Sequence, residues 1–96
     1  MDAVTRAVRG CIRALRERGV VRVDVFGSVA RGTAQAQSDV DFLVYFGATP
    51  SLRDLVEVRR ALADAVGRDV DVITPGALLG APRLRERVLG EAVRVA

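Results

Sequence analysis

The spacing of apolar residues predicts a helix and then a strand at the start of the chain. Residues 2–18 have the periodicity of an amphipathic helix, with arginines on one side. Its apolar face would comprise Val4, Val8, Cys11, Ile12 and Leu15. Gly19 suits the end of that helix, and residues 20–26 alternate as a strand does. The two faces of this strand would carry Val21, Val23 and Val25 on one side and Arg22, Asp24 and Phe26 on the other.

A turn, a short helix and a loop separate this strand from the next one. Gly27-Ser28 turns the chain, residues 29–31 form the short helix, and the small polar residues 33–38 form the loop. Residues 39–46 then predict a second strand. Because its later part is apolar on both faces, we expect this strand to lie centrally in a covered sheet.

The rest of the chain predicts a helix, a third strand and a last helix. Ser51 and Asp54 have the spacing of a capping box at the start of a helix over residues 52–66, which Gly67 closes. The apolar face of that helix would comprise Leu52, Leu55, Val56, Leu62 and Val66, interrupted by Arg59. Residues 69–73 predict the third strand, and Thr74-Pro75 opens a short helical turn. The last helix would turn inward Leu84, Val88, Leu89 and Ala92.

These elements predict an α/β (α+β) fold in which a small mixed sheet is flanked by helices. The helix between the second and third strands makes a crossover, so these two strands should be parallel. If Gly27-Ser28 and the aspartates at the start of the second strand act together, the first two strands must run antiparallel. We therefore expect a sheet of about three to four strands in a single domain over residues 1–96.

The composition of the chain indicates whether it folds, where in the cell it is expected and which partners it binds. Half of the residues are apolar, so the chain should fold, yet no run approaches the roughly 18 to 20 apolar residues that span a bilayer. The arginine-interrupted N-terminal segment lacks the apolar block of a signal peptide, and a cytoplasmic protein is expected. All fifteen basic residues are Arg, with acids between them, so solvated helix faces are the expected source of the net charge of +3, with an anionic partner as the alternative. Since the few aromatic residues alternate within strands as core residues do, direct nucleic-acid binding is not expected.

The absence of His and the single Cys limit the chemistry that the chain can perform. Zinc sites and His-based nucleophilic catalysis lose their usual ligands and bases. Cys11 falls on an apolar helix face, where a buried small hydrophobe is the expected role. Any metal ion must therefore be held by oxygen atoms, which favours Mg²⁺ or Mn²⁺.

Three aspartates in the predicted strands are candidates for such a metal site. Asp39 and Asp41 lie two apart on one strand, so both carboxylates point to the same face. Carboxylates this close repel each other unless a cation lies between them, and a pair of divalent ions supports phosphoryl transfer. The third strand offers Asp69 and Asp71, of which Asp71 lies deeper in the strand and is the better third ligand.

The residues before these aspartates suit a phosphate group. Gly27 removes the side chain where a phosphate must approach the backbone closely. Ser28 adds a hydroxyl group at the start of a helix, where free backbone N–H groups favour an anion. Gly-Ser alone is a common turn sequence. Only its spacing to the aspartate pair makes it a specific indication of a phosphate-binding turn.

The string GSVARGTAQAQSDVDFLV resembles the signature of the DNA-polymerase-beta-like nucleotidyltransferase superfamily, in particular its minimal nucleotidyltransferase (MNT) branch. The match consists of Gly-Ser, ten residues and Asp-x-Asp, together with the Ala-Arg-Gly and Ser-Asp pairs of that branch. The segment VDVITP resembles the family strand that carries a third aspartate, which maps onto Asp71. The resemblance extends from the first strand into the last helix.

The resemblance implies a site and a reaction. Asp39, Asp41 and Asp71 would be the catalytic residues and would hold two Mg²⁺ ions. Gly27 and Ser28 would bind the β- and γ-phosphates of ATP, and Arg31 would either add charge to that site or form a surface ion pair. The reaction would transfer a nucleoside monophosphate to a hydroxyl group and release pyrophosphate.

The resemblance also implies a partner. Family members of this size are often antitoxins of toxin–antitoxin modules and adenylylate a tyrosine of a HEPN-domain ribonuclease toxin. We therefore expect a protein adenylyltransferase in a hetero-oligomer with such a toxin, and an apolar surface on the last helix could also serve a homodimer. Two alternatives are an antitoxin that neutralises its toxin by binding alone, and an enzyme that modifies a small molecule. Relatives of the second kind normally carry an additional helical domain.

Overall fold

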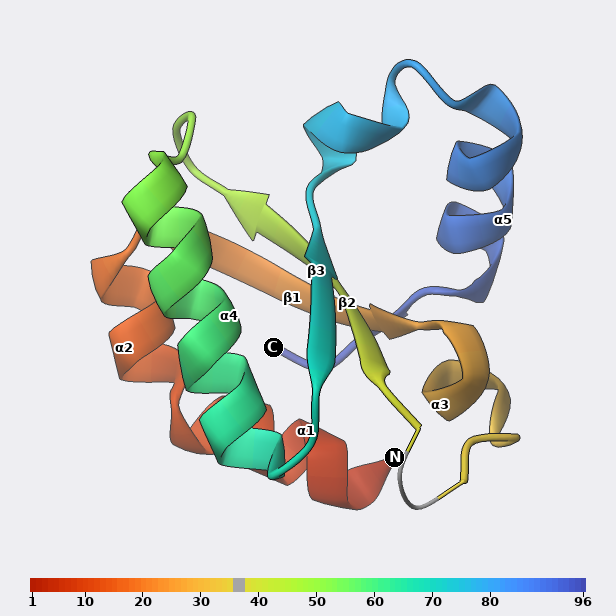
Figure 1. The fold of residues 1–96 in the computed structure, drawn as a ribbon, viewed down its shortest axis with the longest axis horizontal. Coiled ribbons are helices and arrows are strands. Elements are labelled where there is room, and N and C mark those ends of the chain that lie inside the picture. Colours follow the sequence, from red (N-terminus) through yellow and green to blue (C-terminus); the bar gives the residue numbers. More distant parts are fainter. Residues whose placement is uncertain (36–37) are drawn as a thin grey trace.

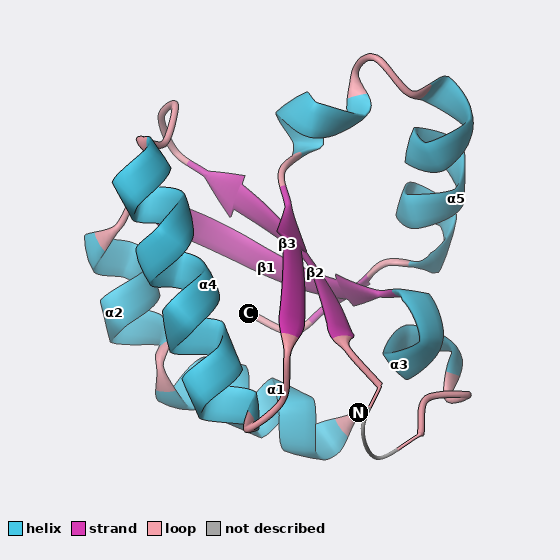
Figure 2. Cartoon of the chain, viewed as in Figure 1, coloured by secondary structure: helices cyan, strands magenta, loops and turns pink. Residues whose placement is uncertain are grey.

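The computed structural model describes residues 1–35 and 38–96, so part of the predicted 33–38 loop lies outside the described residues. A four-stranded sheet is flanked by helices (Figures 1 and 2). The elements in chain order are α1 (Asp2–Gly10), α2 (Ile12–Glu17), β1 (Val20–Phe26), α3 (Gly27–Arg31), β2 (Val40–Phe46), α4 (Leu52–Val66), β3 (Val70–Ile73), the 3-10 helix η1 (Pro75–Leu78), α5 (Pro82–Glu91) and β4 (Val93–Arg94).

The sheet has the mixed topology that the sequence predicts. The strand order is β3-β2-β1-β4, with β2 antiparallel to β1 and parallel to β3. The crossover through α4 therefore gives the expected parallel pair. The short β4 pairs antiparallel with β1, at an edge of the sheet that the sequence pattern did not assign to any particular segment.

The two faces of the sheet have different coverings. The larger core lies under α1, α2 and α4, and it contains Val8, Leu15, Val25, Phe42 and Leu62. On the opposite face Leu43 packs with Leu78 of η1 and Val88 of α5. The short helix α3 contacts β1, β2 and α5, and its Val29 belongs to the larger core. The second face is the one that carries the aspartates of β2 and β3.

The predicted single helix over residues 2–18 is wrong, because the chain forms two helices that meet at Cys11. Gly10 ends α1, and Cys11 leaves the helical conformation with φ −109° and ψ 13°. Gly is a poor helix former in an interior position, which makes this the weakest point of the pattern. The Cys11 thiol is half-buried and donates a hydrogen bond to the Val8 carbonyl at 3.3 Å. Burial raises the pKa of this thiol, which fits the predicted packing role.

Two helices bury only part of the face that the sequence predicts, since Leu62 of α4 and Val88 of α5 are buried as expected. In α4 Val58 is fully buried, whereas Leu52 and Val56 are 78% and 51% exposed. In α5 only Val88 is buried, and Leu84 and Leu89 are exposed. Both helices are apolar on more than one side, so periodicity alone does not select the side that meets the sheet. The capping box of Ser51 and Asp54 and the left-handed Gly67 are confirmed.

The predicted faces of β1 are also changed at its beginning. The pairing with β2 shifts register between Val20 and Arg22. Val20 is consequently buried together with Val23, and Val21 is exposed. A bulge of this kind adds one residue to a strand and reverses the faces before it.

None of the helices in the described part of the chain combines the length and apolarity needed to cross a bilayer.

Candidate active site

Three strand ends bring the predicted residues to one edge of the sheet (Figure 1). Phe26, the last residue of β1, lies opposite Asp41 in the antiparallel pair. Asp41 lies beside Asp71 in the parallel pair of β2 and β3. Gly27, Asp41 and Asp71 therefore meet, although they belong to three separate segments of the sequence. This juxtaposition is the one that the predicted site requires.

Asp41 is the centre of a cluster of negative charge. Its side chain is half-buried, and burial is the main reason why its pKa is raised above the ordinary value of 3.8. The negative charges of Asp71 and Asp39 and a hydrogen bond with Asp71 raise this pKa further, whereas the charge of Arg31 lowers it. A divalent cation between the carboxylates would remove this repulsion, and carboxylate oxygens are the ligands that Mg²⁺ prefers.

Asp39 lies just outside the predicted strand, since β2 begins at Val40, and its side chain is exposed. Within residues 1–35 and 38–96, no three acidic, His or Cys side chains lie close enough together, as placed, to hold a metal ion. Asp41 and Asp71 thus form a prepared pair, and Asp39 would complete the set by turning an exposed side chain. The donor chemistry fits Mg²⁺, with Asp39, Asp41 and Asp71 as the ligands that the chain offers.

Gly27 fits against Asp41 in a way that no other residue could. Its φ angle is +72°, in the left-handed region that residues with a side chain rarely adopt. A Cβ atom at this position would lie 2.3 Å from Oδ2 of Asp41. The backbone of the turn and the central carboxylate are therefore in direct contact.

The Gly-Ser turn leads into α3, which begins at Gly27, two residues earlier than predicted. Ser28 is half-buried in the first turn of this helix, and its carbonyl accepts a hydrogen bond from the Thr33 N–H at 2.9 Å. Gly32 ends α3 in the left-handed conformation, with φ +75°. The short helix thus places Gly27, Ser28 and Arg31 along one turn beside the carboxylates.

Arg31 forms an ion pair that the sequence did not assign to a partner. Its Nη1 atom lies 2.9 Å from Oε1 of Glu91, the last residue of α5. Oε2 of the same carboxylate accepts a hydrogen bond from the Gly27 N–H at 3.2 Å. Sequence reasoning missed Glu91 because an acid near the end of a surface helix carries no local signal of this role.

Arg68 is a second residue that sequence reasoning missed. Its guanidinium donates hydrogen bonds to the carbonyls of Ser38, at 2.9 Å from Nε, and Gln35, at 3.2 Å from Nη2. The Val40 N–H donates to the Asp69 carbonyl at 3.1 Å. These contacts fix the chain on both sides of Asp39 and thereby the start of β2.

One more carboxylate on this face of the sheet is already neutralised. Asp24 is 1% exposed in the middle of β1, and both of its oxygens accept hydrogen bonds from Arg22, at 2.8 and 3.1 Å. The Arg22 guanidinium also lies over the ring of Tyr45, 5.0 Å from its centroid. Asp24 is paired within its own strand and is not a candidate ligand.

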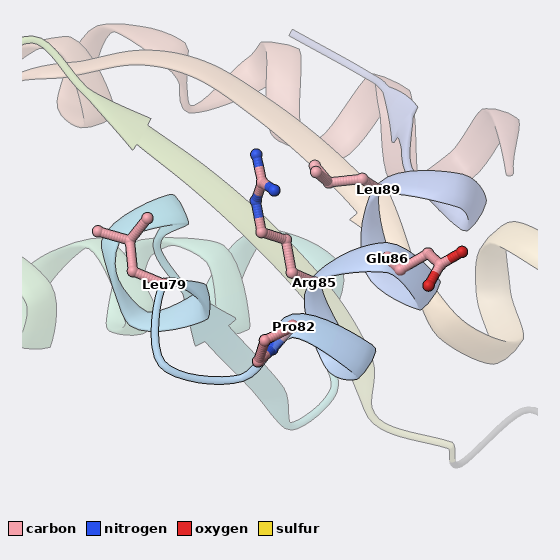
Figure 3. A pocket seen from close by; sticks show the side chains of 5 residues that line it. All are labelled: Leu79, Pro82, Arg85, Glu86 and Leu89. Atoms are coloured by element: carbon pink, nitrogen blue, oxygen red, sulfur yellow. The ribbon is translucent and has the colours of Figure 1, made fainter.

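A shallow hollow lies between η1 and α5, and its lining contains none of the three site aspartates. Figure 3 shows its side chains, which are Leu79, Pro82, Arg85, Glu86 and Leu89. The hollow is therefore a feature of the α5 surface rather than of the carboxylate edge.

Comparison with known proteins identifies relatives over nearly the whole chain. A family model described as a nucleotidyltransferase domain matches residues 8–95. Protein adenylyltransferase MntA of Thermococcus cleftensis is 42% identical over 82 residues, which cover 84% of this chain and 81% of the relative. A Methanocaldococcus jannaschii protein, provisionally named a protein adenylyltransferase, is 42% identical over 87 residues, 91% of each chain.

Solved structures share the fold. One that is provisionally assigned as a minimal nucleotidyltransferase is 42% identical, with a TM-score of 0.72 and 93% of each chain covered. A toxin–antitoxin complex with AMP-PNP matches at 24% identity with a TM-score of 0.71, over 92% of this chain and 71% of that one. At the latter identity the likeness concerns the fold alone.

Proposed function

This chain belongs to the nucleotidyltransferase domain family, and we propose that it transfers AMP from ATP to a hydroxyl group of a partner protein. The MNT resemblance of the Gly27–Asp41 stretch is confirmed by the family match and by the 42% identical relatives. The observation that carries the proposal is the meeting of Gly27, Asp41 and Asp71 at one edge of the sheet.

Mg²⁺ fits this site, with Asp39, Asp41 and Asp71 as its ligands. When bound, Mg²⁺ would neutralise the charge of the triphosphate and of the pyrophosphate that leaves. Burial is the main cause of the raised pKa of Asp41, and the neighbouring charges of Asp71 and Asp39 raise it further. That repulsion between carboxylates is what a divalent cation would relieve. Two ions, as the family resemblance implies, are part of the proposal.

The protein residues would perform the remaining tasks of the transfer. Gly27 lets the triphosphate approach the backbone, and Ser28 and Arg31 supply donors to its phosphate oxygens. The acceptor hydroxyl oxygen would form a bond to the α-phosphorus while the bond from that phosphorus to pyrophosphate breaks. Asp71, which is exposed at the edge of the site, would take the proton that the hydroxyl loses.

The relatives support a protein as the acceptor. The T. cleftensis relative is named a protein adenylyltransferase. One structural neighbour comes from a complex of the tri-AMPylated HEPN toxin of Shewanella oneidensis with MNT antitoxin. It matches at 20% identity with a TM-score of 0.67. We infer that the partner of this chain is a HEPN-domain toxin, that a tyrosine of the toxin is the acceptor, and that this chain is the antitoxin.

Surface composition is compatible with such a partner. Leu79 in the η1–α5 connection is 78% exposed, and Leu84 and Leu89 of α5 are 38% and 44% exposed. Apolar side chains gathered on one helical surface are typical of protein interfaces. They lie on the same side of the sheet as the carboxylate edge, where a bound partner could present a hydroxyl group.

The test is transfer of radiolabel from α-labelled ATP to a co-encoded HEPN protein in the presence of Mg²⁺. Wild-type protein should label the toxin, and mass spectrometry should place AMP on a tyrosine. The Asp39→Ala, Asp41→Ala form should lose labelling to background, because the ligands of the metal ions are gone. The matched control is Asp69→Ala, which removes an exposed carboxylate beside β3 that the site does not use and should leave labelling within twofold.

Two results would overturn the assignment. Labelling that survives the double substitution would remove the aspartates from catalysis. If the double variant still protects cells from the toxin as well as wild type does, the protein neutralises its partner by binding and transfer is dispensable.

A further inference from the structure

Glu91 links the last helix to the two groups that would hold the phosphates. Its Oε2 accepts a hydrogen bond from the Gly27 N–H at 3.2 Å, and its Oε1 accepts one from Nη1 of Arg31 at 2.9 Å. The Glu91 side chain is 21% exposed, whereas that of Arg31 is 50% exposed. A half-exposed arginine is thus held by a more buried carboxylate.

Both groups that Glu91 holds belong to the short helix α3, which begins against Asp41. Gly27 is the first residue of this helix and Arg31 is the last. The Gly27 backbone packs so closely against Oδ2 of Asp41 that a Cβ atom would clash. Any movement of Glu91 would therefore change the position of the turn and of the Arg31 guanidinium together.

We propose that Glu91 is a positioning residue of the nucleotide site, which fixes the Gly27 amide and the Arg31 guanidinium against Asp41. The inference rests on the proposed function, because it takes Gly27 as the backbone that the triphosphate approaches and Arg31 as a donor to its phosphate oxygens. Glu91 acts through them and does not itself touch the reacting atoms. Bound at two points, the turn keeps one geometry before the nucleotide arrives, so that less ordering is needed on binding.

The geometry requires both oxygens of a carboxylate. Each oxygen serves one donor, Oε2 the Gly27 N–H and Oε1 the Arg31 guanidinium. Gln has the same length but offers one oxygen and one NH₂ group, so one of the two donors would face another donor. Asp keeps both oxygens but is one methylene shorter. Glu91→Gln therefore removes one contact and the charge with little change of shape.

The experiment compares Glu91→Gln with Glu86→Gln on the same helix. Glu86 is exposed and lines the hollow on α5 with Arg85 and Leu89, away from the carboxylate edge (Figure 3). Measurements are the KM for ATP, kcat for transfer, binding of a fluorescent ATP analogue with Mg²⁺, and the thermal midpoint. Glu91→Gln should lower kcat/KM and the affinity for the ATP analogue about tenfold, the effect of one charge-assisted hydrogen bond. Because Glu86 lies beside the apolar surface proposed for the partner, it is the control for nucleotide binding and stability, and Glu86→Gln should bind the analogue within twofold of wild type.

A coupling measurement separates positioning from simple attachment of α5. If Glu91 acts through Arg31, Glu91→Gln should slow the Arg31→Ala variant less than it slows wild type. The loss that remains would come from the contact with Gly27. The losses of the two single variants should therefore not add in the double variant. If Glu91 only attaches the helix, Glu91→Gln would lower the thermal midpoint while the folded protein keeps its full kcat and KM. That result would overturn the proposal.

Amide hydrogen exchange distinguishes a failure of this inference from a failure of the proposed function. In the nucleotide-free protein, the Gly27 amide should exchange about tenfold faster in Glu91→Gln than in Glu86→Gln. If wild type transfers no nucleotide but binds the analogue more tightly than Glu91→Gln does, the proposed function fails and the role of Glu91 stands. Equal exchange and equal binding in the two variants would overturn the role of Glu91 even in an active enzyme.

Discussion

At the scale of single residues, Gly27 has two independent reasons to be glycine. Its φ of +72° lies in the left-handed region, which costs a residue with a side chain about 1–2 kcal/mol. Its Cα also faces Oδ2 of Asp41 at a distance that leaves no room for a methyl group. The first constraint belongs to the turn, and the second belongs to the site.

Gly27→Ala should therefore destabilise the fold and abolish transfer, and Gly67→Ala should only destabilise it. Gly67 ends α4 with φ +68°, and an added Cβ there would meet nothing within 4 Å. Its substitution should lower the free energy of unfolding by about 1 kcal/mol and leave the specific activity unchanged. Denaturant unfolding and the transfer assay measure both effects, and normal activity in Gly27→Ala would contradict the close contact with Asp41.

The residues that the sequence could predict are those whose role is visible in their local spacing. Gly27, Asp41 and Asp71 stand next to apolar strands, so each pattern indicates both the strand and the chemistry at its end. Glu91 and Arg68 have no such signal. Each acts on residues far away in the sequence, and only the packing of α5 and the loop before β2 reveals the contact.

At the scale of elements, α4 shows where periodicity is insufficient. The sequence predicts Leu52, Val56 and Leu62 on the buried face; Leu62 is buried as predicted, but the helix buries Val58 in place of Leu52 and Val56. Leu52 and Val56 are four residues apart, as are Val58 and Leu62, so helical spacing alone does not decide which pair meets the sheet. The boundaries of α4, set by Ser51 and Gly67, are local and were predicted correctly.

The difference in burial between the two faces of α4 can be tested by measuring the free energy of unfolding. Val58→Ala removes buried atoms and should lower the free energy of unfolding by about 2 kcal/mol. Val56→Ala changes a side chain that is 51% exposed and should stay within about 0.5 kcal/mol of wild type. Equal losses in the two variants, measured by denaturant unfolding, would contradict the orientation of α4.

At the scale of the whole molecule, the mixed sheet is what assembles the site. β2 lies between an antiparallel and a parallel neighbour, so the end of β1 and the start of β3 both meet its first residues. The sequence predicted this arrangement because the crossover helix dictates the parallel pairing, and the antiparallel pairing follows if the Gly-Ser turn and the aspartates act together. It did not identify β4, whose two residues follow a helix directly and pair only because the edge of β1 is open to them.

This assembly concentrates negative charge, and the cost of that charge gives a further prediction. The folded-state pKa of Asp41 is raised above 3.8. Its contribution to stability is therefore full below pH 3.8 and is lost as the pH rises through the raised pKa. At neutral pH without divalent ions, ionised Asp41 should therefore lower the stability of the fold, and the loss should be small because the side chain is only half-buried and solvent screens it.

Asp41→Asn should accordingly raise the thermal midpoint of the protein in EDTA at neutral pH, because the amide carries no charge and can donate a hydrogen bond to Asp71. Mg²⁺ at tenfold its Kd should stabilise wild type by about 1.4 kcal/mol, and the same concentration should stabilise Asp41→Asn far less. Asp69→Asn, which removes an exposed carboxylate outside the site, should follow wild type under both conditions. Thermal unfolding of these three proteins, in EDTA and with Mg²⁺, measures their midpoints and the stabilisation by Mg²⁺. A lower midpoint of Asp41→Asn in EDTA would contradict the repulsion, and equal stabilisation by Mg²⁺ would contradict Asp41 as a ligand.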